Sequence, residues 1–154
     1  MSQATKGKPP VTLLGFDFGT KRIGIATGQT ITGSVSALTT LTSVNDKPDW
    51  QSIGKLINEW QPDLLIVGLP LNMDGSDTGI TPTVRRFGNQ LKGRYNLPVE
   101  MVDERLSSVE ARSRLHDDAS LRHKRFDREQ VDQIAAQVIV QSWLAQQQEK
   151  GEPD

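Results

Sequence analysis

The sequence predicts an α/β fold with a mixed five-stranded sheet flanked by helices. Three short apolar segments come first, and a turn of only three residues joins the first two. Helical and strand patterns then alternate through the middle of the chain. A tight turn indicates antiparallel neighbours, whereas strands separated by a helix are typically parallel. Both arrangements in one chain therefore favour a sheet of mixed direction.

Three strands are expected at the start. The run 11–18 (VTLLGFDF) is short and apolar, and the run 22–27 (RIGIAT) follows it after a Gly-Thr-Lys turn. This spacing predicts an antiparallel hairpin. Residues 35–41 alternate apolar and polar side chains well enough for a third strand.

Helices and strands alternate from Pro48 onward. Pro48 is expected to open a helix, because proline suits a first helical turn. The run 63–68 (DLLIVG) is continuously apolar, as in a strand buried on both faces. A helix over about 82–95 and a strand over 98–103 follow. The apolar positions of the first helix recur at helical spacing: Trp50, Ile53, Leu56, Ile57 and Trp60.

The last third carries two helix-start signals. Ser107 with Glu110 fits a capping box, and Asp127 with Gln130 fits a second, which should open a helix to about Gln147. Residues 117–126 between them are charged and irregular. Residues 11–147 are expected to form a single domain, since 154 residues fit one core better than two. A disordered lead-in over 1–10 and a flexible tail over 148–154 complete the prediction.

Composition excludes several classes of function. The chain has no cysteine, which removes disulfides, thiolate metal sites and cysteine nucleophiles, and its two histidines are a poor basis for a zinc site. No apolar run approaches the ~18 residues of a membrane span, and the N-terminus lacks a secretory apolar region. We expect a cytoplasmic protein with no membrane partner, and a monomer or weak homodimer.

Asp17 is the first candidate site residue. It lies inside an apolar run, near the carboxyl end of the expected strand, where ligands of open α/β sheets gather. A buried carboxylate is costly unless a cation meets it. The alternative is a turn aspartate that accepts hydrogen bonds from the amides of Gly19 and Thr20.

Two more strands should deliver polar residues to the same edge. The strand at 63–68 leads into LPLNMDGSDTG, in which Asn72 is a candidate substrate contact. The strand at 98–103 ends in Asp103, Glu104 and Arg105, where adjacent acids emerge directly from an apolar run. An ion pair that fixes the start of the next helix is the alternative for these residues.

The last helix carries the next candidate, Asp132. Small Ala135 and Ala136 should let this helix approach the sheet closely enough for Asp132 to reach the strand ends. A surface aspartate favoured by the helix dipole is the alternative. Asp132 is expected at the rim of an apolar face formed by Val131, Ile134, Ala135, Val138 and Ser142.

Carboxylates from three remote segments at one edge would repel one another without a counter-ion. Mg²⁺ or Mn²⁺ resolves that repulsion, and a pair of such ions can activate water for phosphodiester hydrolysis. Phosphate contacts are available too, because residues 85–128 hold eleven Lys or Arg against seven acids. Ordinary solvated helix faces explain this charge equally well. The candidate phosphate-binding residues are Lys21, Arg22, Arg105, Arg122, Lys124 and Arg125.

The chain contains, in this order, the four segments LGFDFGTKRIGIA, IVGLPLNMDGS, VDERLSS and VDQIAA. These segments closely resemble, in order and spacing, the motifs of the YqgF/RuvX family of pre-16S ribosomal RNA nucleases and Holliday junction resolvase-like proteins. The resemblance runs from about Leu13 to Leu144. It implies a ribonuclease H-like fold, whose outline matches the element order above, and metal-dependent phosphodiester hydrolysis. It also implies trimming of the 5′ end of the 16S ribosomal RNA precursor, with the ribosome or its precursor as partner.

The resemblance assigns the catalytic acids residue by residue. The first-strand acid falls on Asp17, the acidic pair on Asp103 and Glu104, and the last-helix acid on Asp132. The longer reach of Glu104 favours it over Asp103 as the metal ligand, beside Asp17 and Asp132.

Three other functions are compatible with parts of the sequence. The same fold is compatible with a resolvase that acts on branched DNA. It is also compatible with a non-catalytic RNA-binding factor of ribosome assembly, and metal-dependent cleavage of model substrates would distinguish a nuclease from that factor. DFGTKRIG also resembles the phosphate-binding turn of actin-like and sugar kinases. Those enzymes close two such domains around ATP, whereas this chain has no second Asp-x-Gly-Thr turn. A complete kinase is therefore disfavoured.

Overall fold

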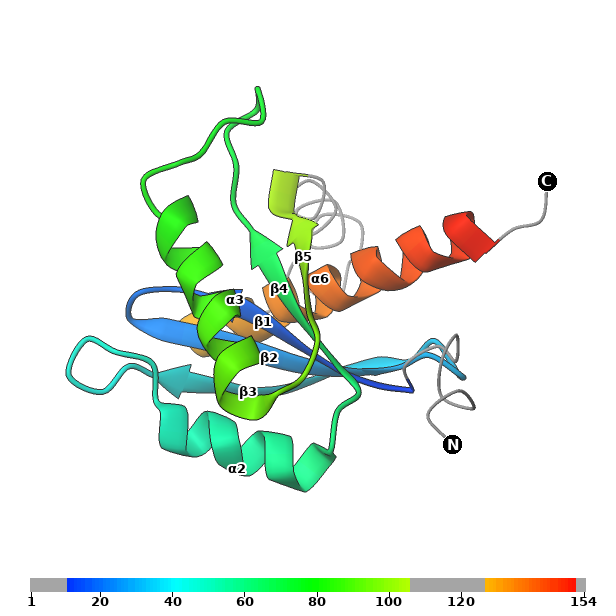
Figure 1. The fold of residues 1–154 in the computed structure, drawn as a ribbon, viewed down its shortest axis with the longest axis horizontal. Helices are drawn as coiled ribbons and strands as arrows, with labels where there is room; N and C mark the ends of the chain where they lie inside the picture. The colour runs from blue at the N-terminus through cyan, green and yellow to red at the C-terminus, as the bar shows by residue number, and fades with distance from the viewer. Residues whose placement is uncertain (1–10, 106–126, 152–154) are drawn as a thin grey trace.

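The computed structural model describes residues 11–105 and 127–151, and it contains the predicted mixed sheet (Figure 1). The strand order is β3-β2-β1-β4-β5. β2 is antiparallel to β1 and β3, whereas β4 is parallel to β1 and β5. The strands are β1 Thr12–Phe18, β2 Arg22–Gln29, β3 Val35–Thr42, β4 Leu64–Leu69 and β5 Val99–Asp103.

Helices cover both faces of the sheet (Figure 1). α2 (Trp50–Trp60) and α3 (Thr81–Tyr95) pack on one face, and α6 (Arg128–Gly151) packs on the other. Among these described helices, none is long and apolar enough to cross a membrane. The helix expected at Ser107 and the charged stretch 117–126 lie outside the described residues, as do 1–10 and 152–154.

Two helix starts follow from local chemistry. α2 begins at Trp50 rather than at Pro48, because the Asp49 carboxylate accepts hydrogen bonds from the Ser52 amide at 3.2 Å and the Ser52 hydroxyl at 2.6 Å. α6 begins with the predicted capping box. The Gln130 amide donates to Asp127 Oδ1 at 2.8 Å, and the Asp127 amide donates to Gln130 Oε1 at 3.1 Å.

Alternation along β1 sends its side chains to two separate cores. Leu14 and Phe16 belong to the core under α2 and α3, whereas Leu13 belongs to the core under α6. Asp17 follows the Leu13 side of this alternation, so it lies on the α6 side at the carboxyl end of the strand. Phe18 packs on the opposite side, against Phe87 of α3.

The expected apolar face of α6 was wrong at its N-terminal end. Val131 is 45% exposed, and Ala136 and Ile139 instead pack on the sheet with Val140 and Trp143. Ala136 lies four residues after Asp132, so Asp132 is on the sheet-facing side rather than at the rim. The physical reason is that glycines in the sheet set the approach of this helix. A Cβ at Gly15 would lie 2.2 Å from Val140 Cγ2.

Candidate active site

The carboxyl groups of Asp17 and Glu104 meet at the carboxyl edge of the sheet. Asp17 is the penultimate residue of β1, and Glu104 follows β5 directly. The parallel pairing of β4 with both strands brings these two ends to one edge. There the side chains of Asp17 and Glu104 are hydrogen-bonded to each other. Asp17 thus contacts the carboxyl group of Glu104, a residue remote in the sequence, as well as lying next to its own turn.

The environment of these two acids favours their protonated forms. Burial raises the pKa of Asp17 well above its ordinary value, and the negative charge of Glu104, the hydrogen bond to Glu104 and the charge of Asp132 raise it further. Burial also raises the pKa of Glu104, although the hydrogen bond from Asp17 opposes that rise. The pKa is therefore raised at both acids, most strongly at Asp17.

Asp132 lies in the first turns of α6 and forms an ion pair with β2. Its Oδ2 accepts a hydrogen bond from Arg22 Nε at 2.7 Å, and both side chains are largely buried, at 19% and 29% exposure. Gly24, the residue paired with Asp17 in the sheet, makes this approach possible. A Cβ there would lie 2.1 Å from the backbone oxygen of Asp132, so α6 rests its backbone on the glycine.

Asp103 lies in a different environment from Glu104. Arg105 donates to the Asp103 carboxylate from its amide at 2.9 Å, from Nε at 2.8 Å and from Nη2 at 2.5 Å. These hydrogen bonds hold the pKa of Asp103 below its ordinary value. Arg105 Nη1 also donates to the backbone oxygen of Met73, tying the loop after β4 to this position at 3.0 Å. The ion pair considered for this segment thus forms at Asp103, which leaves Glu104 to face Asp17.

The remaining predicted contacts are distributed differently. Arg22 is engaged with Asp132, and Lys21 is exposed in the turn after β1. Asn72 organises its own loop, because its Nδ2 donates to Ser76 Oγ and to the backbone oxygen of Asp77, both at 3.0 Å. Three candidates fall outside the described residues: Arg122, Lys124 and Arg125.

Two glycines, Gly24 and Gly68, shape the site, and the sequence-based prediction did not include them. Gly24 admits α6, as above, and a Cβ at Gly68 would lie 2.5 Å from both Glu104 Oε1 and Ile139 Cδ1. Each glycine interrupts an apolar strand segment, RIGIATG or LLIVGL. An isolated glycine inside a strand pattern indicates close approach by another group, and that signal was available in the sequence.

The donor set fits a hard divalent cation. Asp17, Glu104 and Asp132 offer only carboxylate oxygens, and the side chains of the first two are within hydrogen-bond reach of each other. Within residues 11–105 and 127–151, however, no group of three acids or histidines is spaced to hold a metal ion as it stands. Asp132 is paired with Arg22 in this arrangement.

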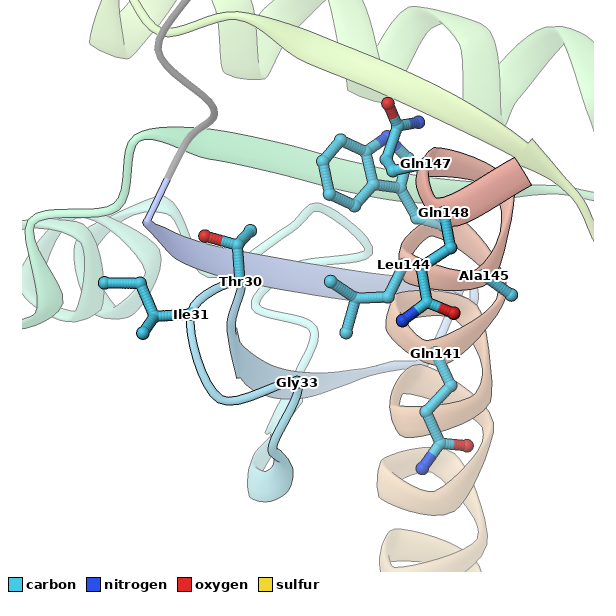
Figure 2. Close-up of a pocket in the computed structure, with 9 residues that line it drawn as sticks. Thr30, Ile31, Gly33, Gln141, Leu144, Ala145, Gln147 and Gln148 are labelled. Carbon is cyan, nitrogen blue, oxygen red and sulfur yellow. The ribbon is translucent and has the colours of Figure 1, made fainter. Parts of the chain in front are cut away.

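A separate pocket of about 530 Å³ lies at the far end of α6 from Asp132 (Figure 2). Thr30 and Ile31, between β2 and β3, face Gln141 and Leu144 of α6 across it. Its lining side chains carry no charge. This pocket therefore takes no part in the acidic site.

Comparison with curated proteins identifies close relatives. A protein of Nitrosococcus oceani is 55% identical over 139 residues, which cover 90% of each chain. A protein of Yersinia enterocolitica is 48% identical over 136 residues, covering 88% of this chain and 96% of its own. Both carry the provisional name pre-16S rRNA nuclease.

Solved structures share the fold at low sequence identity. Thermus thermophilus RuvC in complex with a Holliday junction superposes with a TM-score of 0.57 at 9% identity, covering 94% of this chain and 99% of RuvC. The yeast mitochondrial Holliday junction resolvase Ydc2 gives 0.56 at 13% identity, covering 94% and 82%. The fold is therefore ribonuclease H-like, as the resemblance implied. The model of the family RuvX, described as Holliday junction resolvase, matches residues 11–146, and the chain belongs to this family.

Proposed function

We propose that this chain is a divalent-metal-dependent nuclease that processes the 5′ end of pre-16S ribosomal RNA in the bacterial cytoplasm. The observation that carries the proposal is the hydrogen-bonded pair Asp17 and Glu104, with Asp132 close enough to raise the pKa of Asp17. Carboxyl groups held this close repel one another when ionised, and a divalent cation between them relieves that repulsion. The names of the relatives from Nitrosococcus and Yersinia support the choice of RNA substrate.

In this proposal the three acids hold Mg²⁺ or Mn²⁺, which when bound activates water and stabilises the leaving oxygen of the phosphodiester. Asp17 and Glu104 would hold the cation as carboxylates. In the metal-free protein Asp132 is paired with Arg22 at 2.7 Å on the same side of the sheet, and this ion pair must open for Asp132 to hold the cation. Asp103 is a positioning residue, because it anchors Arg105 and through it the loop at Met73. Residues 11–147 act as one domain.

Lys21 and the basic segment that includes Arg122, Lys124 and Arg125 would contact substrate phosphates. Such contacts make affinity fall steeply with salt concentration. Branched DNA is the second candidate substrate, because the matched family model is described as a Holliday junction resolvase. The two substrates can be separated by comparing the 5′ ends of precursor and mature 16S RNA in cells depleted of the protein. Only the RNA-processing proposal predicts that 5′-extended RNA accumulates.

The direct test compares cleavage of a 5′-extended 16S fragment with Mn²⁺ and with EDTA. Wild-type protein should cleave only with the metal. Asp17→Asn and Glu104→Gln should each lose at least about 100-fold in rate, because the amide keeps the shape but removes the charge. Glu59→Gln is the matched control, since Glu59 is an exposed carboxylate of α2 far from the edge. Wild-type rates in Asp17→Asn with unchanged Mn²⁺ dependence would refute the assignment.

A further inference from the structure

A second pocket lies at the same edge of the sheet as the acids, but on the side of α2 and α3. Its volume is about 380 Å³. Three segments form it: the end of β1 with its turn, the connection from β3 to Trp50, and one stripe of α3. We call it the α3 pocket, defined by Phe18, Lys47, Trp50, Arg86, Phe87 and Arg94.

Aromatic rings form the floor of the α3 pocket. Trp50 lies nearly parallel to Phe87, with ring centroids 5.6 Å apart and planes at 28°, and Phe18 lies 4.9 Å from Phe87. Phe87 is buried, whereas Trp50 and Phe18 remain partly exposed. The guanidinium of Arg94 already lies 4.2 Å over the Trp50 ring. The pocket therefore holds aromatic rings of the kind on which nucleic-acid bases stack, and a base that stacks on Trp50 must displace the Arg94 guanidinium or lie beside it.

Positive charge surrounds this floor. Lys47, Arg86 and Arg94 line the pocket against a single acid, Asp46. Within the part of the chain that the structure describes, none of the three cations forms a salt bridge. Arg85 differs, since it is paired with Asp77 at 2.7 Å. Cations without an acidic partner around an aromatic floor are complementary to a base with its flanking phosphates.

The α3 pocket adjoins the acidic site through β1. Asp17 and Phe18 are consecutive in β1, so the acid faces α6 while the ring faces α3 across the same edge. The rim is held in place by the Ser43 hydroxyl, which donates to the backbone oxygen of Thr20 at 2.8 Å. A nucleic-acid strand that crosses this edge of the sheet can therefore contact both the acids and the pocket.

We propose that the α3 pocket binds one unpaired base of the nucleic-acid substrate, with Lys47 and Arg86 on the flanking phosphates. This inference rests on the proposed nuclease function and names the substrate feature that the site selects. A base in a duplex is paired and stacked, so it cannot reach the floor unless it leaves the helix. The pocket thus favours single-stranded RNA or DNA beside the scissile bond.

The test measures binding in EDTA, where no metal supports cleavage. The probe is a short fluorescent single-stranded RNA, compared by anisotropy with copies that carry one abasic nucleotide at successive positions. One position should weaken binding to wild-type protein by about tenfold, because one stacked base is lost. In Trp50→Leu that same abasic position should have no further effect. If Trp50→Leu does not fold, Phe18→Leu carries the same comparison.

The cations are tested with two adjacent arginines of α3. Arg86→Gln should weaken binding of intact and abasic RNA alike and reduce the salt dependence by about one phosphate contact. Arg85→Gln is the matched control and should leave both unchanged, because Arg85 is already paired with Asp77.

Three results would each overturn the proposal. The first is an equal loss of RNA affinity in Arg86→Gln and Arg85→Gln, and the second is an equal effect of the abasic nucleotide at every position. The third is an affinity for fully paired RNA equal to that for single-stranded RNA. The nuclease assignment has a separate test: it would be refuted if Asp17→Asn still cleaved RNA at the wild-type rate with the same Mn²⁺ dependence.

Discussion

One partly buried acid, Asp17, explains much of the chemistry at the edge of the sheet. Asp17 costs the fold free energy when ionised, because burial and the charges of Glu104 and Asp132 all oppose its carboxylate form. The raised pKa values of Asp17 and Glu104 mean that the metal-free fold favours a protonated carboxyl group at this position. A cation of suitable charge would replace that proton with a stronger interaction.

The raised pKa of Asp17 predicts how the metal-free stability depends on pH. The pKa of Asp17 is raised in the folded state, so its stabilising proton is fully present below the ordinary value near 3.8. The free energy of unfolding should therefore fall as pH rises from about 4 through the raised pKa, by about 1.4 kcal/mol for each unit of the shift. Urea unfolding in EDTA between pH 5 and 8 measures it.

Asp17→Asn supplies the control for this prediction. Its amide donates to Glu104 at every pH, so the decline should largely disappear and the variant should be the more stable protein at pH 8. The depressed pKa of Asp103 acts in the opposite direction, removing stability only below the range measured. Parallel pH profiles for wild type and Asp17→Asn would show that Asp17 is not the titrating group.

Arg22 provides a second expectation, because it neutralises Asp132 in the absence of metal. Arg22→Gln leaves the Asp132 carboxylate without its partner at 2.7 Å, so the metal-free protein should lose about 1 kcal/mol of stability. The same change frees Asp132 for a cation, and Mn²⁺ should then raise the melting temperature at lower concentrations than in wild type. Arg22→Lys, which keeps the charge, should behave like wild type. Weaker Mn²⁺ binding in Arg22→Gln would mean that Arg22 helps to assemble the site.

The helix α6 shows what the sequence could predict and what it could not. Its start was predictable, since the capping box of Asp127 and Gln130 depends on neighbouring residues only. Its buried face was mispredicted near Val131, because hydrophobic spacing there competes with the shape of the sheet beneath. Gly24 decides the outcome by admitting the helix backbone at Asp132.

The same contrast holds for the site. The strand order places Asp17 and Glu104 at one edge, and that could be anticipated from the alternation of strands and helices. The choice between Asp103 and Glu104 depends on Arg105, whose side chain folds back on Asp103 rather than on Glu104. Spacing along the chain carries no information on that choice, because all three residues are adjacent.

The packing of α6 on β2 gives a prediction for Gly24. A Cβ at this position would lie 2.1 Å from a backbone atom, which cannot move without displacing the helix. Gly24→Ala should therefore lower the free energy of unfolding by about 2 kcal/mol and impair cleavage by shifting Asp132. Gly93→Ala on α3 is the control, since no described atom lies within 4 Å of a Cβ added there and alanine favours a helix by about 0.5–1 kcal/mol. Equal stability changes in the two variants would disprove the close contact.

The molecule as a whole places two kinds of chemistry on the two faces of one sheet edge. Acids meet on the side of α6, and the aromatic, basic α3 pocket opens on the side of α2 and α3. β1 joins them through the consecutive residues Asp17 and Phe18. A substrate that spans the edge can therefore contact both, and its binding should be linked to the binding of metal.

That linkage leads to a prediction for the complete protein. Mg²⁺ and Mn²⁺ sites with few protein ligands are commonly completed by substrate phosphates, so metal and RNA should each strengthen binding of the other by the same factor. We expect Mn²⁺ to tighten binding of single-stranded RNA by about tenfold, within the usual range for coupled sites. Stopped-flow anisotropy at constant ionic strength measures this before cleavage products accumulate. Asp17→Asn should bind RNA equally with Mn²⁺ and with EDTA, because it cannot hold the metal. If Mn²⁺ tightens binding to that variant as much as to wild type, the ion acts on the RNA, and the acids at the edge of the sheet do not connect the two ligands.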